Sequence, residues 1–285
     1  VKGRAVSRST SGYADAVGVI EAMTLLTTFL SDTNSLKMKQ QIKYVIESMP
    51  VEFSESGLNL PAIEPYTEII NNENIKAVNH IKQGAVAFNA MDRNLQLNDE
   101  FTFALSRSSN RIAKYEYMSG ENLKPWFQGD GAYYLYLSGV DQTKQYGVNY
   151  FTTVNPYRLA GTTVPNEERK TIMELYNGSQ FYPEYPAGST EQNDYVYFPV
   201  GTNEFSGSVT LKDYGVSMAG MQLGDDNGYT AKQNGILPDD FVAYKNANGN
   251  KSWFIMNDKI VFVGSDIDDN LDRDVTTTID NRMSD

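Results

Sequence analysis

Two arginines near the start of the chain could bind an anion. Arg4 and Arg8 are four residues apart in the run GRAVSR, so in a helix both guanidinium groups would project from one face. A guanidinium group makes bidentate hydrogen bonds to carboxylate or sulfate groups. The alternative is a solvated or ion-paired surface, which is the usual place for arginine.

A dense mixture of charged, glycine and aromatic residues follows in the middle of the chain. It comprises GENLKPWFQGDGAYYLY at 120–136 and NPYRLAGTTV at 155–164. Glu116 and Glu121 precede Trp126, and a carboxylate there could orient a catalytic base or hold an arginine, or could belong to a surface loop. Trp126 and the tyrosines after it could stack on sugar rings. Alternating aromatic residues also form one side of an ordinary core.

Several other chemistries have no support in the sequence. The chain has no cysteine, which excludes thiol nucleophiles, cysteine-ligated zinc and disulfides. His80 is the only histidine and is predicted to be exposed, so we expect no catalytic triad or histidine metal site. The acidic run DIDDNLDRD at 266–274 could bind calcium, but it lacks the glycine and distal glutamate of an EF-hand loop, which favours a solvated turn. We therefore expect no cofactor and no metal.

The composition narrows the class of protein further. The 285 residues include 24 basic and 36 acidic side chains, which give a net charge of -12. This balance argues against nucleic-acid binding. There is no apolar run of about 20 residues, so no membrane span is predicted. The first residues lack both Met and the apolar core of a signal peptide, and we expect a processed or excised piece of a longer protein.

The first quarter of the sequence has helical periodicity. Apolar residues recur at helical steps over 13–30 and over 35–48. Asn34 or Ser35 could cap the second of these helices, and Pro50 would end it. A third short helix is predicted at 61–70.

Short runs typical of strands replace this pattern from about residue 84. They are FTFALS, AYYLYL, YVYFPV, GSVTL, FVAYK, SWFIM and KIVFVG. The turn-like sequence NANGN predicts a hairpin between FVAYK and SWFIM. Strands at this spacing without long helices between them predict antiparallel sheets packed face to face.

Three of the runs already described together resemble a family of polysaccharide lyases that includes hyaluronate lyase, chondroitin AC lyase and xanthan lyase. They are GRAVSR, YEYMSGENLKPWFQGDGAYYLY and NPYRLAGTTV. A further pair, KSWFIMNDKIVFVGSDI and VTTTIDNR, resembles most the hyaluronate lyases of Gram-positive cocci. The resemblance spans nearly the whole chain in order.

The resemblance implies an α+β multi-domain fold. Residues 1–76 would be the last helices of an incomplete α/α toroid, 77–83 a linker, and 84–285 an antiparallel β super-sandwich. The activity implied is β-elimination of uronic-acid polysaccharides, with the family's catalytic Asn, His and Tyr lying upstream of this sequence. We therefore expect the isolated chain to have little or no activity.

The resemblance also assigns roles to particular residues. Arg4, Arg8 and Glu116 match catalytic-cleft positions. Contact with substrate is implied for Ser119, Asn122, Trp126 and Arg158. The run NPYRLAGTTV is favoured as architecture that fixes the cleft-facing edge, and its Arg158 could instead line the substrate entry. Ser119 stands where several relatives have Asn, which puts that contact in doubt.

The implied partners are an acidic polysaccharide and the missing upstream toroid segment of the same protein, in a secreted or cell-surface setting. Hyaluronan is the expected polymer. Chondroitin or xanthan remains an alternative, as does a non-catalytic carbohydrate-binding or structural piece.

Overall fold

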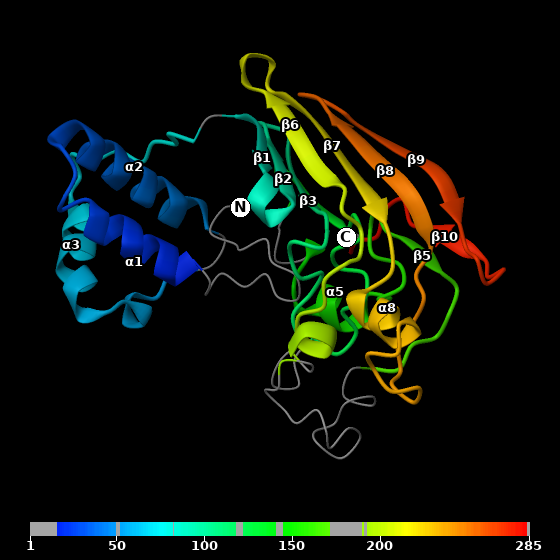
Figure 1. Cartoon of the computed structure of the whole chain (residues 1–285). Coiled ribbons are helices and arrows are strands. Elements are labelled where there is room, and N and C mark those ends of the chain that lie inside the picture. Colours follow the sequence, from blue (N-terminus) through cyan, green and yellow to red (C-terminus); the bar gives the residue numbers. More distant parts are fainter. Residues whose placement is uncertain are drawn as a thin grey trace. The chain divides into compact units, whose positions relative to one another are not determined.

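The chain divides into two compact units. A computed structural model describes residues 16–49, 52–81, 83–117, 122–140, 145–171, 190 and 193–283. One unit comprises residues 1–82 with 141–147, and the other comprises 83–140 with 148–285. Helices make up the described secondary structure of the first unit, and antiparallel sheets dominate the second (Figure 1). The predicted α+β class is confirmed.

The first unit is a small helical bundle. Its elements are α1 (Ala16–Leu26), α2 (Asp32–Ser48), the 3-10 turn η2 (Glu55–Gly57) and α3 (Leu60–Asn71). Their apolar faces meet in a core that contains Ile20, Ile42, Leu58, Ala62, Tyr66 and Ile69. Helical periodicity therefore predicted the right element type because each helix buries one stripe.

The helix ends differ in part from those expected. Helix α2 begins at Asp32, so the predicted cap at Asn34 or Ser35 is wrong. Ser35 lies inside the helix, and its hydroxyl donates to the carbonyl of Thr27 at 2.8 Å. Met49 is extended, as the residue before a proline usually is.

Polar side chains fix the segments that flank these helices. The carboxylate of Glu21 accepts hydrogen bonds from the backbone and side-chain nitrogens of Asn59, at 3.0 and 2.7 Å. His80 is exposed, as predicted. Its ring nitrogen lies 2.8 Å from the Oε1 of Gln40, and its backbone nitrogen donates to Gln41 at 2.6 Å.

Two four-stranded antiparallel sheets and a strand pair form the second unit. One sheet has β1 (Gly84–Phe88), β2 (Arg93–Leu97), β3 (Phe101–Ser106) and β4 (Tyr133–Leu137) in that order. The other has β6 (Ser206–Leu211), β7 (Val216–Leu223), β8 (Asn248–Ile255) and β9 (Ile260–Asp268). The pair is β5 (Thr163–Pro165) with β10 (Val275–Thr277). The short helices are η3 (Asn89–Met91), α5 (Val148–Thr153), η5 (Asn193–Tyr197), η6 (Lys212–Tyr214) and α8 (Asn227–Gln233).

The two four-stranded sheets share an apolar core, as the sequence predicted. Most of its members come from β3, β4, β7 and β8, and they include Phe103, Leu105, Tyr133, Ala219, Met221, Trp253 and Ile255. Strand β8 alternates between buried and partly exposed positions along most of its length. This is the pattern of a strand that buries one face.

Two of the predicted strands are wrong. YVYFPV at 195–200 overlaps the single π-helical turn η5, in which Phe198 donates its N–H to the carbonyl of Asn193 at 2.8 Å. FVAYK at 241–245 has no regular structure, and the predicted NANGN hairpin is absent because β8 begins at Asn248. Strand β8 instead turns back into β9, where Met256 donates its N–H to the carbonyl of Lys259 at 2.9 Å.

Side-chain hydrogen bonds take the place of a neighbouring strand after residue 241. The backbone nitrogen of Asn246 donates to the carboxylate of Asp225 at 2.7 Å. The Asn246 side chain donates to the carbonyl of Gly224 at 3.1 Å and to Asp226 at 3.0 Å. The backbone groups of an irregular segment need partners, and here asparagine and aspartate supply them.

A buried lysine joins three parts of the second unit. The Nζ of Lys114 lies 2.9 Å from a carboxylate oxygen of Asp130 and 2.6 Å from one of Asp226. Its side chain is only 1% exposed. Burial alone would lower the pKa of Lys114, but the two carboxylates outweigh burial and raise it. For Asp130, burial is the larger effect and raises the pKa, although Lys114 opposes it.

A second buried lysine lies on β8. Lys251 donates from its Nζ to the carbonyl of Gly161, and the residue is 6% exposed. Burial lowers the pKa of Lys251 to about 8, while Asp130 acts in the opposite direction. The two lysines therefore share Asp130 but respond differently to the same core.

Replacing Lys114 with Met should destabilise the second unit strongly. The change leaves Asp130 and Asp226 without their cation, and breaking a buried ion pair costs roughly 3–5 kcal/mol. Urea unfolding followed by tryptophan fluorescence is the measurement, because both tryptophans, Trp126 and Trp253, lie in this unit. The control Lys259→Met removes an exposed pair and should cost less than about 1 kcal/mol. Equal losses in the two variants would contradict the assigned role of Lys114.

Replacing Lys251 with Met should change how stability depends on pH. Between about 8 and 10.5 the unfolded chain holds the Lys251 proton and the folded chain has released it, so the unfolding free energy of the wild type rises with pH. The full effect is about 1.4 kcal/mol per pH unit. Unfolding at several pH values in this window should show that slope in the wild type relative to the variant, and parallel curves would contradict it.

Candidate functional site

The backbone on both sides of Glu116 is held by an adjacent segment. Lys114 donates its N–H to the carbonyl of Pro199 at 2.8 Å, and Tyr117 donates to the carbonyl of Tyr197 at 2.9 Å. The residues directly before and after Glu116 are buried tyrosines, whereas Glu116 is only half-buried. The carboxylate of Glu116 therefore extends from a backbone that has little freedom to move.

An amide pair closes the chain back onto Glu116. The Nδ2 of Asn122 donates to the carbonyl of Glu116 at 2.7 Å and to the Oε1 of Gln128 at 3.0 Å. Gln128 donates in return to the Oδ1 of Asn122 at 2.7 Å. Asn122 has a φ of 55°, a left-handed conformation that asparagine tolerates better than most residues. Gln128 was not predicted as a site residue, since a lone glutamine beside Trp126 belongs to no distinctive motif.

Trp126 brings the two runs of the central motif together. Its ring stacks on Tyr157 with centroids 5.3 Å apart and planes 22° apart. The hydroxyl of Tyr157 accepts a hydrogen bond from the backbone nitrogen of Arg169 at 2.6 Å. Trp126 is 3% exposed, so its ring lies within a core instead of presenting a face to a sugar. This placement differs from the substrate contact that the resemblance implied.

Arg158 directly follows the stacked tyrosine, and its guanidinium donates hydrogen bonds to two neutral groups. Its Nη1 donates to the carbonyl of Tyr157 at 2.9 Å, and its Nη2 donates to the Oδ1 of Asn166 at 3.0 Å. Both partners are neutral, and among the described residues Arg158 forms no ion pair with a carboxylate. A half-buried guanidinium without a counter-ion is suited to a carboxylate ligand.

The other predicted site residues cannot be placed. Arg4, Arg8 and Ser119 lie outside the described residues. The structure connects Glu116 to Asn122 by a hydrogen bond, and it connects Trp126 to the residue before Arg158 by ring stacking.

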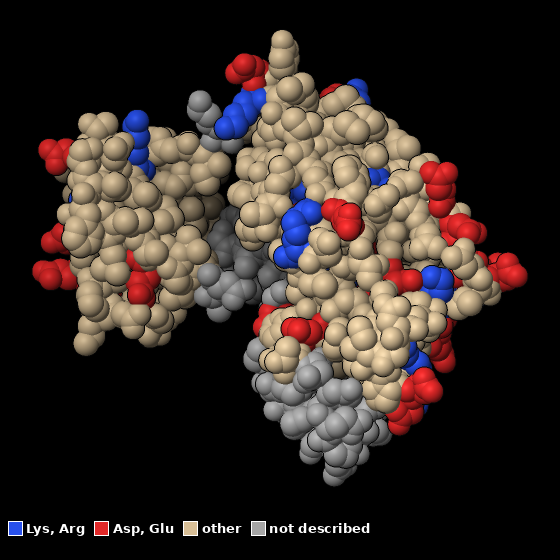
Figure 2. Space-filling model, viewed as in Figure 1, with Lys and Arg blue, Asp and Glu red and all other residues tan. Residues whose placement is uncertain are grey.

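Acidic side chains gather along the margin of the second unit near β9 and β10, as comparison of Figure 2 with Figure 1 shows. Within the run 266–274, Asp269 takes hydrogen bonds from Arg273 at 2.6 and 3.0 Å, which lower the pKa of Asp269. Arg273 also pairs with Glu167 at 2.9 Å. Among the residues that the structure describes, no three His, Cys, Asp or Glu side chains form a group that could hold a metal.

The helices in the described part of the chain are too short or too polar to cross a bilayer.

Known proteins resemble this chain along its length. It is 29% identical over 99% of its residues to a hyaluronate lyase of Staphylococcus aureus, and covers 30% of that protein. It is also 29% identical over 99% of its residues to a xanthan lyase of a Bacillus species, and covers 25% of it. A solved structure of chondroitin AC lyase from Streptomyces coelicolor A3 in complex with chondroitin sulphate matches 96% of the chain with a TM-score of 0.72 and 24% identity, and the chain covers 32% of it.

The chain matches only part of each of these proteins. The chain spans about a quarter to a third of the length of the relatives that it matches. The family model that matches is the super-sandwich domain of polysaccharide lyase family 8, over residues 83–285. That range coincides with nearly all of the second unit, and the chain belongs to polysaccharide lyase family 8.

Proposed function

We propose that this chain is part of an extracellular lyase that cleaves hyaluronan by β-elimination and releases unsaturated oligosaccharides. Membership of the lyase family supports the reaction, and the relatives named as hyaluronate lyases support the polymer. The observation that carries the proposal is the fixed position of Glu116, whose backbone is hydrogen-bonded on both sides and closed by Asn122.

The reaction explains why a fixed carboxylate and arginines are useful. A base removes the proton from C5 of the uronic acid, the bond from C4 to the glycosidic oxygen breaks, and a C4–C5 double bond forms. The leaving oxygen takes a proton from an acid. Negative charge develops on the substrate carboxylate as the C5 proton leaves, so donors already in position lower the barrier.

We assign these residues positioning and binding roles. Glu116 orients its neighbours in the cleft. Arg4 and Arg8 act on the anionic substrate and raise the local positive potential. Ser119, Asn122 and Arg158 provide polar contacts, and Arg158 is the strongest of these because its guanidinium has neutral partners within the described structure. For Trp126 we propose a supporting role, because the ring is buried.

The proposal includes the rest of the protein. Residues 1–76 would be the last helices of an incomplete α/α toroid, and 77–83 would link them to the β-domain at 84–285. An upstream toroid segment would supply the groups that transfer the proton. Secretion or display at the cell surface follows from a polymeric extracellular substrate.

A chimera tests the function directly. The chain should replace its matching segment in the Staphylococcus aureus hyaluronate lyase, and the ultraviolet absorbance of the unsaturated product should be followed with hyaluronan, chondroitin and xanthan. We expect the chimera to act on hyaluronan fastest and the chain alone to be inactive. Product from the chain alone would contradict the upstream location of the proton-transfer groups.

In the same chimera, Glu116→Gln should lower kcat/KM by roughly 10- to 100-fold, because a small misplacement of reacting groups is costly. The pH profile of kcat should also shift, which a loss of folded protein alone would not cause. The matched control is Glu100→Gln, since Glu100 is exposed directly before β3. A profile and rate equal to those of the control would overturn the role of Glu116.

A second candidate function is carbohydrate binding without catalysis, which the absence of a counter-ion for Arg158 in the described structure favours. Under either function, Arg158→Ala should weaken binding of the chain to hyaluronan by about tenfold, the value of one charge-assisted hydrogen bond. The salt dependence should also become shallower. Titration calorimetry at several salt concentrations is the measurement, with Lys259→Ala as the surface-charge control. Equal affinity in the two variants would remove Arg158 from the binding surface.

A further inference from the structure

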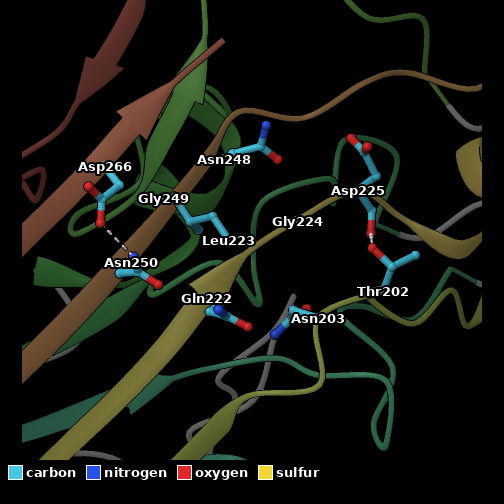
Figure 3. A pocket seen from close by; sticks show the side chains of 10 residues that line it. All are labelled: Thr202, Asn203, Gln222, Leu223, Gly224, Asp225, Asn248, Gly249, Asn250 and Asp266. Atoms are coloured by element: carbon cyan, nitrogen blue, oxygen red, sulfur yellow. Dashed lines mark hydrogen bonds between the residues drawn. The ribbon is translucent and has the colours of Figure 1, made fainter. Parts of the chain in front are cut away.

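An open groove lies where β7 ends and β8 begins. Its volume is about 410 Å³. The residues that line it are mostly polar: Thr202, Asn203, Gln222, Leu223, Gly224, Asp225, Asn248, Gly249, Asn250 and Asp266. Figure 3 shows amide side chains projecting from the two neighbouring strands, with Thr202 and Asn203 on a facing loop.

The groove lies at the polar end of a sheet face whose other end is apolar. Toward the other end, Val209, Met218, Phe254 and Val261 pair across four strands and are all exposed. Farther along the same face, β7 and β8 place Gln222 directly opposite Asn250, and β9 adds a serine to the row. Directly opposed residues lie close enough for their side chains to act together. The polarity of this face therefore changes where the groove begins.

Several amide groups in the groove have unused hydrogen-bonding capacity. Within the described structure, the side chains of Gln222 and Asn248 have no hydrogen-bond partner. Asn250 donates from its Nδ2 to Asp266 at 3.0 Å, which leaves the side-chain Oδ1 of Asn250 available to accept a hydrogen bond. Each amide offers donors and an acceptor, so the groove can bind groups that both donate and accept.

The charges of the groove select against an anion. The carboxylate of Asp225 is already bound by the Nζ of Lys245 at 2.9 Å. The hydrogen-bond partners of the Asp266 carboxylate, Asn250 and Ser265, are both neutral. A cation is not favoured either, because the described carboxylates form no group that could hold a metal. The chemistry that remains is that of an uncharged ligand with many hydroxyl groups.

We propose that this groove binds neutral sugar units, with Gln222 and Asn248 holding adjacent hydroxyl groups. Its volume lies in the range of small-molecule sites, roughly 300–1,000 Å³. A peptide strand would need apolar pockets for alternate side chains, whereas Leu223 is the one large apolar side chain in the lining. The proposal does not depend on lyase activity, so its success or failure is separate from that of the proposed function.

Glycine-selective ¹⁵N labelling of the whole chain provides the test. Gly224 and Gly249 line the groove and report on it among the 22 glycines. Titration with glucose or with N-acetylglucosamine should shift these two signals selectively. Glucuronate at the same ionic strength should bind at least about threefold more weakly, because Asp266 repels it.

Variants identify the groove as the site. Gln222→Ala and Asn248→Ala should each weaken sugar binding about fivefold, the effect of one lost hydrogen bond. Gln233→Ala is the matched control, because Gln233 is an exposed amide outside the lining of the groove. The glycine signals far from the groove confirm that each variant is folded.

Three results would overturn the proposal. One is the absence of any shift at Gly224 and Gly249 with either neutral sugar, and another is equal binding by the two groove variants and the control. The last is a shift at these glycines with calcium chloride but not with sugars, which would make the groove a cation site.

Discussion

The buried contact of Lys114 with two carboxylates holds the second unit together at the place where function is proposed. It connects the segment that carries Glu116, the turn before β4 that contains Asp130, and Asp226 at the start of α8. Gly129 fits beside this contact only because it lacks a side chain, since a Cβ there would lie 2.9 Å from the carbonyl of Lys114. Removing one charged partner from such a group leaves the others buried and unpaired, so the position of Glu116 depends on all three.

Sequence patterns predicted the helices and strands whose formation depends mainly on residues close together in the chain. The helical stripes of α1, α2 and α3, and the β-rich runs that became β3, β4, β6 and β9, were all recognisable in the sequence. FVAYK and YVYFPV are also rich in aromatic residues and valine but form no strands, because contacts with distant residues determine their conformations. The carboxylate of Asp225 binds Asn246 from 21 residues away, and no short window of sequence contains that information.

At the candidate site, the sequence indicated positions but not their contacts, and the roles of these residues stay predictions. Recognisable motifs marked Glu116, Asn122, Trp126 and Arg158, but not what each side chain contacts. The stacking of Trp126 on Tyr157 joins segments 31 residues apart, and it buries a ring that was expected to stack on a sugar. Lys114 gave no signal at all, because a buried lysine looks like a surface lysine until its partners are known.

The apolar row of Val209, Met218, Phe254 and Val261 has a consequence for how the chain behaves in solution. An exposed patch of this kind attracts other copies of itself, while the net charge of -12 repels them. Salt screens that repulsion but leaves the attraction between apolar surfaces intact. We therefore expect self-association of the isolated chain to increase with ionic strength.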